Sequence, residues 1–189
     1  RAGLVLARMQ ATKQALRRVM QLRRAGLDPA VATNAGVRVA QQLRTFAPYA
    51  RAEVVFTYQA MGNEVPTEEI IRDCHAAGKC VFVPSPGERS FVRLPSPQVS
   101  GRGTVDPVGL RGVVLVPLVA WGEGGERLGR GQGWYDRILS RCHQVKVGLG
   151  YEFQRARVPI EPWDVRLDYV VTESRLIEFG GVLSGRRLI

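Results

Sequence analysis

Apolar residues recur every three to four positions in two stretches near the N-terminus. The segment MQATKQALRRVMQLRRAG, residues 9–26, has this helical spacing and ends at Gly26, a residue type that commonly terminates helices. Asp28 followed by Pro29 is typical of a helix N-terminus, and the helical spacing of apolar residues continues to about Phe46. The chain is therefore predicted to open with two consecutive helices.

Short β-branched runs bounded by turn residues follow, and helical segments alternate with them. Strands are predicted at 53–58, 79–84, 113–117, 145–150 and 168–172. Residues 67–78 predict a helix with Thr67 as N-cap and Gly78 as terminator, and residues 134–142 also have helical spacing. This alternation predicts right-handed βαβ units and a mostly parallel sheet.

The longest irregular stretch, residues 84–112, is rich in proline, glycine and serine. Strands of one type flank it, so we interpret it as a long loop over a single domain rather than a linker. Met9 is a plausible original start. We therefore expect residues 1–8 to be an N-terminal extension and residues 9–189 to form a single three-layer α/β domain.

Composition narrows the ligand class. The 189-residue chain is 45% hydrophobic and carries a net charge of +10, mostly from arginine. This charge favours polyanions: nucleotides, phosphorylated or polycarboxylate ligands, or nucleic acid. An arginine excess also arises from genome composition, so the charge does not choose among these ligands by itself.

The number and spacing of the cysteines and the length of the apolar runs indicate the cellular compartment in which the protein is expected. Cys74, Cys80 and Cys142 are an odd number without CxxC spacing, which argues against a disulfide framework or zinc site and favours a reducing cytoplasm. The longest apolar run near the N-terminus, AGLVLA, is too short for a membrane span. We expect a cytoplasmic monomer that is not bound to membranes.

The segment RLGRGQGWYDR, residues 127–137, is the strongest candidate for chemistry. It follows the strand predicted at 113–117, where open α/β sheets bind ligands. Alternating glycines leave amide groups free to form an anion nest, two arginines add bidentate charge, and Asp136 has the chemistry of a Mg²⁺ ligand. The pattern is neither a Walker A loop nor a GxGxxG fingerprint, and a purely structural glycine loop explains it equally well.

Four blocks in order resemble the 5-formyltetrahydrofolate cyclo-ligase family, also called methenyltetrahydrofolate synthetases. They are KQALR (13–17), NEVPTEEII (63–71), RLGRGQGWYDR (127–137) and the closing segment VGLGYEFQ…VPIEPWDVRLDYVVTE (147–173). The third is the most specific. The resemblance spans about Met9 to Glu173 and implies a fold similar to sugar-isomerase and CoA-transferase-like domains.

The resemblance also implies a reaction. The family uses ATP and Mg²⁺ to close 5-formyltetrahydrofolate to 5,10-methenyltetrahydrofolate, releasing ADP and phosphate. The formyl oxygen is a poor leaving group, so the γ-phosphoryl group is placed on it before N10 attacks the formyl carbon. Such chemistry needs chiefly positioning and charge neutralisation.

By resemblance, each site residue has an expected role. ATP is expected at Lys13, Arg17, Arg127, Leu128, Gly129, Arg130, Gly131, Gln132, Gly133, Trp134 and Tyr135, with Arg130 and Tyr135 as catalytic residues. The folate substrate is expected at Gln59, Met61, Glu64 and Trp134, and Mg²⁺ at Asp136 and Asp164. Without the resemblance, a solvated basic helix face is the favoured explanation of Lys13 and Arg17.

The sequence departs from the family at three places, which leaves alternatives open. Trp121-Gly122 replaces a common Phe-Asp, unless Glu123 substitutes for that aspartate; Trp134 replaces a tyrosine; and Trp163 stands where many members have histidine. One alternative is therefore a nucleotide- or folate-binding protein without turnover. A second is a basic nucleic-acid-binding protein, which no RNA- or zinc-finger-type motif supports. We expect His75 and His143 not to be catalytic and Asp168 to be structural.

Overall fold

A computed structural model describes residues 2–85, 90–96, 103–105 and 110–180 of the 189-residue chain. At its centre lies an eight-stranded sheet with the order β10-β9-β8-β5-β1-β2-β3-β4. Its strands are β1 (Val54–Phe56), β2 (Cys80–Ser85), β3 (Ser90–Arg93), β4 (Thr104–Val105), β5 (Val113–Pro117), β8 (Val145–Leu149), β9 (Tyr169–Val171) and β10 (Leu176–Glu178). The five strands from β9 to β2 are parallel to their neighbours, and β3, β4 and β10 add antiparallel edges.

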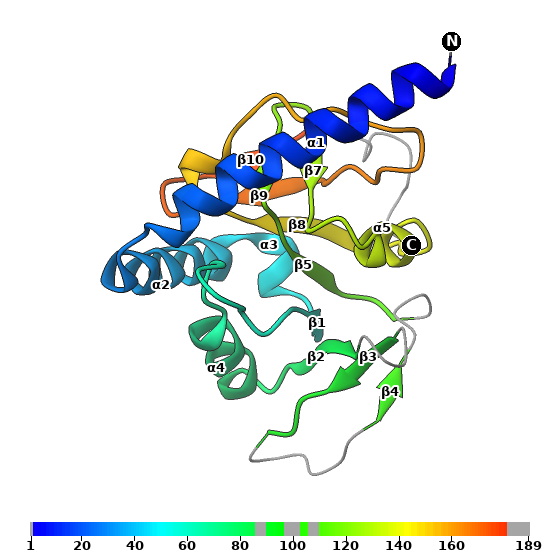
Figure 1. Ribbon diagram of the computed structural model, residues 1–189. Coiled ribbons are helices and arrows are strands. Elements are labelled where there is room, and N and C mark those ends of the chain that lie inside the picture. The colour runs from blue at the N-terminus through cyan, green and yellow to red at the C-terminus, as the bar shows by residue number, and fades with distance from the viewer. Residues whose placement is uncertain (1, 86–89, 97–102, 106–109, 181–189) are drawn as a thin grey trace.

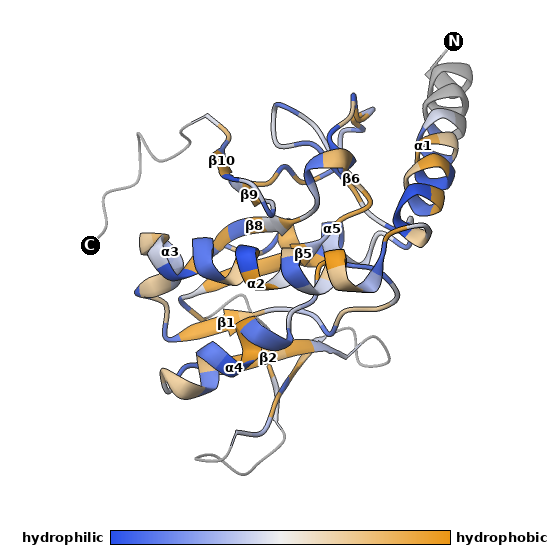
Figure 2. Cartoon of the chain, turned by 90° about the vertical axis from the view of Figure 1, so that its left-hand side faces the viewer, coloured by the Kyte–Doolittle hydropathy of each residue, from blue (hydrophilic) through white to orange (hydrophobic). Residues whose placement is uncertain are grey.

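Helices cover both faces of this sheet (Figure 1). In chain order they are α1 (Ala2–Ala25), α2 (Pro29–Thr45), α3 (Ala47–Ala50), α4 (Glu68–Ala76), α5 (Trp134–Leu139) and the 3₁₀ helix η2 (Glu152–Gln154). Helices α2, α3 and α4 lie on one side of the sheet and α5 on the other (Figures 1 and 2). The predicted three-layer α/β architecture is confirmed.

Alternate residues of the central strands fill two separate cores. Val55 of β1 and Leu115 of β5 pack with residues of α2, α3 and α4. Phe56 and Val116, the next residues along the same strands, pack instead with Ile138 and Leu139 of α5. Both faces of these strands are buried, so the strands read as continuous apolar runs rather than alternating ones.

Helix α1 packs on a small hairpin outside the main sheet. Strands β6 (Ala120–Trp121) and β7 (Arg127–Leu128) pair antiparallel, and Met20 of α1 is buried against Val119, Ala120 and Leu128. The sequence predicted no strand here, since two-residue strands carry too little periodicity to be seen. The hairpin brings the start of the glycine loop under α1.

Most predicted elements occur with small shifts in their ends, and two predictions need correction. Helix α1 begins at Ala2, so residues 2–8 continue the helix that was predicted from Met9. Thr67 is the N-cap residue of α4 as predicted, but its hydroxyl donates to the Tyr58 carbonyl at 2.6 Å instead of capping the helix. The irregular stretch 84–112 contains β3 and β4, which extend the sheet by antiparallel pairing.

Local signals at helix ends behave as expected at two sites. The Asp28 side chain accepts a hydrogen bond from the Ala30 amide at 2.7 Å and caps α2. Gly78, with a φ of +70°, follows α4. The described cysteines Cys74, Cys80 and Cys142 are not joined by disulfides.

No helix among the described residues is both long enough and apolar enough to span a bilayer.

Candidate active site

A cavity of about 1110 Å³ opens at the carboxyl ends of β1, β2 and β5. The chain leaves β1 toward β2 on one side, while β5 lies on the other side of β1. A reversal of this kind leaves a crevice at the strand ends where α/β proteins bind ligands. Tyr58 and Gln59 after β1, Pro84 of β2 and Leu118 after β5 form part of its wall.

All residues that the sequence predicted for the site lie in the wall of this one cavity. They are Lys13, Arg17, Gln59, Met61, Glu64, every residue from Arg127 to Asp136, and Asp164. These positions come from α1, the segment after β1, the glycine loop and the segment before β9. Four distant pieces of the sequence therefore converge.

The glycines of the loop are required by backbone angle or by space. Gly131 has a φ of +101°, in the region that disfavours side chains, and a β-carbon there would lie 3.3 Å from Cζ of Arg17. Gly129 has an ordinary φ, yet a β-carbon at that position would lie 2.6 Å from Nη1 of Arg127. Two guanidinium groups thus occupy the space that side chains at these glycines would fill.

Arg17 and Arg127 hold the loop from opposite sides. Nε of Arg17 donates to the Gly129 carbonyl at 2.8 Å. Arg127 is 7% exposed, donates from Nη2 to Asp136 at 3.0 Å, and lies over the Tyr135 ring with Cζ 5.5 Å from its centroid. The loop is therefore built around fixed positive charge.

A second charged cluster joins α1 to the segment before β9. The Lys13 ammonium donates to Glu161 at 2.6 Å and also to Asp164. Lys13 is 3% exposed and Glu161 is 4% exposed, while Gln10 donates to the other Glu161 oxygen. One cation and two acids leave this cluster with a formal charge of −1.

Arg130 and Glu64 form an ion pair across the cavity. Nε and Nη2 of Arg130 lie 3.0 and 2.9 Å from the same Glu64 oxygen, and Nη2 also donates to the Met61 carbonyl at 3.2 Å. The Met61 amide donates to the second Glu64 oxygen at 3.0 Å. Glu64 is 6% exposed, so its carboxylate is held in place by the loop that the sequence assigned to ATP.

Two neighbouring aromatic residues present buried donors in the cavity wall. The Trp134 indole N–H and the Tyr135 hydroxyl are both buried and have no hydrogen-bond partner among the described residues. Burial raises the pKa of Tyr135 far above its usual value, although the nearby Arg127 charge opposes this. The phenol therefore stays neutral and able to donate. Unpaired buried donors are costly unless a ligand or water accepts from them.

The sequence profile of the 5-formyltetrahydrofolate cyclo-ligase family matches residues 9–173. The chain belongs to this family. That span includes α1 from Met9, the glycine loop and both acids expected to bind metal, so the family match and the cavity involve the same residues.

Relatives and solved structures support the assignment over most of the chain. The 5-formyltetrahydrofolate cyclo-ligase of Escherichia coli K12 is 30% identical over 183 residues, covering 85% of this chain and all of the relative. The mouse enzyme of the same name is 26% identical and covers 87% of this chain and 95% of its own. The NMR structure of Aquifex aeolicus 5,10-methenyltetrahydrofolate synthetase is 27% identical with a TM-score of 0.76, covering 94% and 96% of the two chains.

The acids expected to hold Mg²⁺ in this cyclo-ligase fold suit that ion. Asp136 and Asp164 both line the cavity, and no group of three or more His, Cys, Asp or Glu side chains is gathered as a metal cluster among the described residues. Mg²⁺ commonly takes one or two carboxylates and completes its shell with water and substrate phosphate. The two acids beside the glycine loop have the chemistry of Mg²⁺ ligands, although Asp136 here pairs with Arg127 and Asp164 with Lys13.

The Trp121-Gly122 departure from the family lies outside the cavity wall, and local packing explains it. Trp121 is 2% exposed and its indole donates to the Tyr151 carbonyl at 3.1 Å. A β-carbon at Gly122 would lie 2.4 Å from a Glu126 oxygen. Glu123 is outside the cavity wall and pairs with Arg155.

Sequence reasoning missed Gln10, Glu161 and the exposed Trp163 as cavity residues. Glu161 stands three positions before Asp164, and this spacing of two acids in IEPWD was the available signal. His75, His143 and Asp168 are not part of the cavity wall. Asp168 accepts the Lys146 amide at 2.7 Å between β8 and β9, as its structural interpretation predicted.

Proposed function

We propose that this protein closes 5-formyltetrahydrofolate to 5,10-methenyltetrahydrofolate and converts ATP to ADP and phosphate in doing so. Membership of the cyclo-ligase family supports the reaction, and the convergence of all the expected site residues in one cavity carries the proposal. On one side of the cavity, two arginines and a glycine loop suit an anionic substrate. On the other side, a buried acid suits a substrate that donates hydrogen bonds.

The proposed chemistry proceeds in two steps. The formyl oxygen attacks the γ-phosphorus, the bond to the bridging oxygen breaks, and ADP departs. N10 of the folate then attacks the activated formyl carbon and loses its proton, and the C–O bond breaks. Phosphate leaves with the former formyl oxygen, and the product is the methenyl cation. The protein's contribution is to align the two substrates and stabilise the developing charge.

The triphosphate is proposed to lie along the glycine loop. Arg17 and Arg127 already flank this loop, and Arg130 can turn from Glu64 toward a phosphate because its side chain is 41% exposed. Lys13 lies at the end near Asp164, where Glu161 and Asp164 pair with its ammonium. Trp134 and Tyr135 line the same wall, where their rings can pack against the substrates.

The pteridine ring is proposed to bind at Glu64. A carboxylate can accept two N–H bonds from the amino-pyrimidine edge, and Glu64 is held by the Met61 amide and Arg130. Gln59 and Met61 complete this end of the cavity. Asp136 and Asp164 are proposed to hold Mg²⁺, which when bound neutralises phosphate charge and orients the γ-phosphoryl group.

The proposed reaction is tested by the methenyl chromophore. Mixing the protein with 5-formyltetrahydrofolate and MgATP is expected to produce the methenyl absorbance, and omission of ATP should prevent it. Asp136→Asn should lower the rate about 100-fold or more, as expected when charge stabilisation at a reacting group is lost. The matched control is Asp73→Asn, since Asp73 pairs with Arg44 at the surface and lies outside the cavity wall.

The outcome also separates the proposed enzyme from a protein without turnover. If calorimetry detects binding of ATP and of 5-formyltetrahydrofolate but no methenyl absorbance develops, the protein is a binding member of the family and the proposed reaction is wrong. If neither ligand binds, the cavity assignment itself is wrong.

A further inference from the structure

Trp163 stands at the tip of a tightly held turn on the cavity rim. The Asp164 amide donates to the Glu161 carbonyl at 3.0 Å, and the Glu161 amide donates to the Asp164 side chain at 2.7 Å. Pro162 and Trp163 are the two central residues of this turn, and proline restricts its backbone further. Trp163 is 56% exposed even though it lines the cavity.

Lys13 fixes this turn to α1. Its ammonium binds the side chains of both Glu161 and Asp164, the first and last residues of the turn. Lys13 and Glu161 are almost fully buried, so the ion pairs are shielded from solvent. The indole is consequently presented from a rigid base, which lowers the entropy lost when a ring binds against it.

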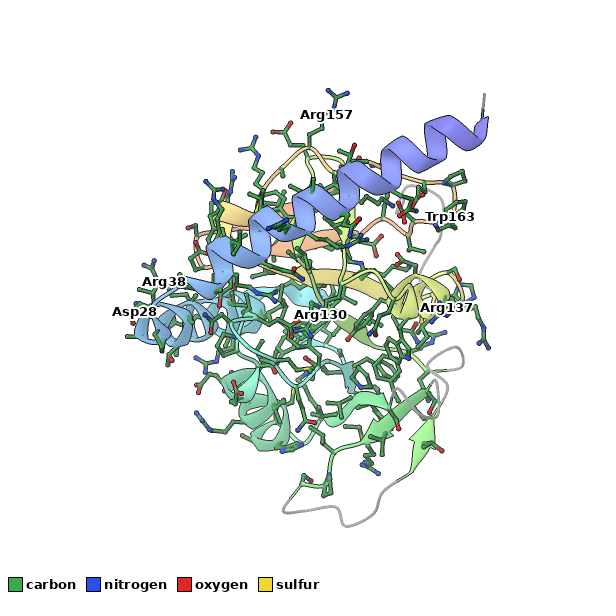
Figure 3. The ribbon with its side chains drawn as sticks, in the orientation of Figure 1. Asp28, Arg38, Arg130, Arg137, Arg157 and Trp163 are labelled. Carbon is green, nitrogen blue, oxygen red and sulfur yellow. The ribbon has the colours of Figure 1, made fainter. Side chains whose placement is uncertain are left out.

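The position of Trp163 distinguishes it from the Glu64 end of the cavity. Figure 3 shows Trp163 on the right-hand side of the molecule near α1, whereas Arg130 lies toward the centre. Arg130 is the residue that pairs with Glu64, where the pteridine is proposed to bind. The glycine loop runs from Arg130 to α5 and holds the anion-binding groups. If the phosphates of a nucleotide bind this loop, its base extends beyond the loop, where the aromatic side chain of Trp163 lies.

We propose that Trp163 stacks on the base of the bound nucleotide and that Lys13 acts as a positioning residue by holding the Glu161–Asp164 turn. This inference rests on the proposed function, because it takes the polyphosphate to lie on the glycine loop. An exposed aromatic side chain is a general platform for a nucleobase, since every base has a π-face. A base bound there by stacking alone is recognised as an aromatic ring, with weak discrimination between adenine and guanine.

Calorimetry on the full chain tests this proposal with three ligands: a non-hydrolysable ATP analogue, inorganic tripolyphosphate, and 5-formyltetrahydrofolate. Trp163→Ala should weaken binding of the ATP analogue about tenfold, as expected from loss of one stacked base. Its affinities for tripolyphosphate and for 5-formyltetrahydrofolate should stay unchanged, because neither depends on the base. Trp163→Phe should retain most of the ATP affinity. Ile160→Ala is the matched control, since Ile160 is exposed on the same segment but outside the cavity wall.

Each other result overturns the inference. Equal affinities of Trp163→Ala and the unaltered protein for the ATP analogue would show that the indole does not contact the base. Weaker binding of tripolyphosphate as well would show a general effect on the loop, and selective loss of 5-formyltetrahydrofolate affinity would assign Trp163 to the folate. Failure of the proposed function gives a different pattern, in which the unaltered protein binds neither nucleotide nor tripolyphosphate.

Discussion

At the scale of single residues, the site depends on glycines that lack side chains as much as on charged residues. Gly129 and Gly131 leave space that the guanidinium groups of Arg127 and Arg17 occupy. The sequence predicted that alternating glycines accompany anion binding. The sequence did not predict that Arg17 would lie against this loop, because Arg17 is 112 positions away from Gly129, whose carbonyl it binds.

Gly131→Ala should have two effects, one on stability through backbone strain and one on nucleotide binding through the space that Arg17 occupies. The φ of +101° is unfavourable for alanine, so the free energy of unfolding should fall by about 1–3 kcal/mol. The added β-carbon should also displace Arg17 and weaken binding of the ATP analogue in calorimetry. Gly78→Ala is the control, because Gly78 has a φ of +70° but no atom near its β-carbon position. It should lose comparable stability and keep its nucleotide affinity; equal affinities in the two variants would contradict the role given to Arg17.

At the scale of elements, the long and regular segments were predictable and the short ones were not. Strands β1, β2, β5, β8 and β9 have β-branched runs that are buried on both faces, and these were found within a few residues. The antiparallel strands β3 and β4 and the β6–β7 hairpin have two to four residues in each strand, too few for a periodic signal. Their pairing is decided by tertiary contacts.

For charged residues on helices, the face that a residue occupies was predictable, but its distant partners were not. Lys13 and Arg17 were predicted to share one face of α1, and both line the cavity. Nothing local to the sequence of α1 indicates that Lys13 is buried between Glu161 and Asp164, because these acids are 148 and 151 positions away. The blocks of the family resemblance brought these distant segments into one prediction, which periodicity could not do.

Lys13→Met should test the connection between α1 and the Glu161–Asp164 turn. Loss of the ammonium leaves two acids in a buried cluster without their cation, which typically costs about 3–5 kcal/mol in the free energy of unfolding. Urea unfolding at neutral pH measures this loss. The control is Lys146→Met, since the hydrogen bond that the Lys146 ammonium makes among the described residues is a long one, to the Gln144 carbonyl at 3.4 Å. If both variants lost similar stability, the buried cluster would not be what holds the turn.

At the scale of the whole molecule, the cavity exists because the parallel sheet reverses its winding at β1. The segments that follow β1 and β5 diverge there, and the glycine loop and α1 close the space between them. The cavity wall holds five basic residues and the four acids Glu64, Asp136, Glu161 and Asp164, so the net charge of +10 is spread over the molecule and not concentrated at the cavity. A phosphate-bearing ligand at this crevice and a folate at Glu64 would be held within reach of each other.

The central claim is that the γ-phosphoryl group is placed on the formyl oxygen in this cavity. The most direct test uses 5-formyltetrahydrofolate labelled with ¹⁸O in its formyl group, with the released phosphate analysed by mass spectrometry. The account predicts that every methenyl product formed is accompanied by one phosphate carrying the ¹⁸O label. Recovery of the label in water, with unlabelled phosphate, would contradict it.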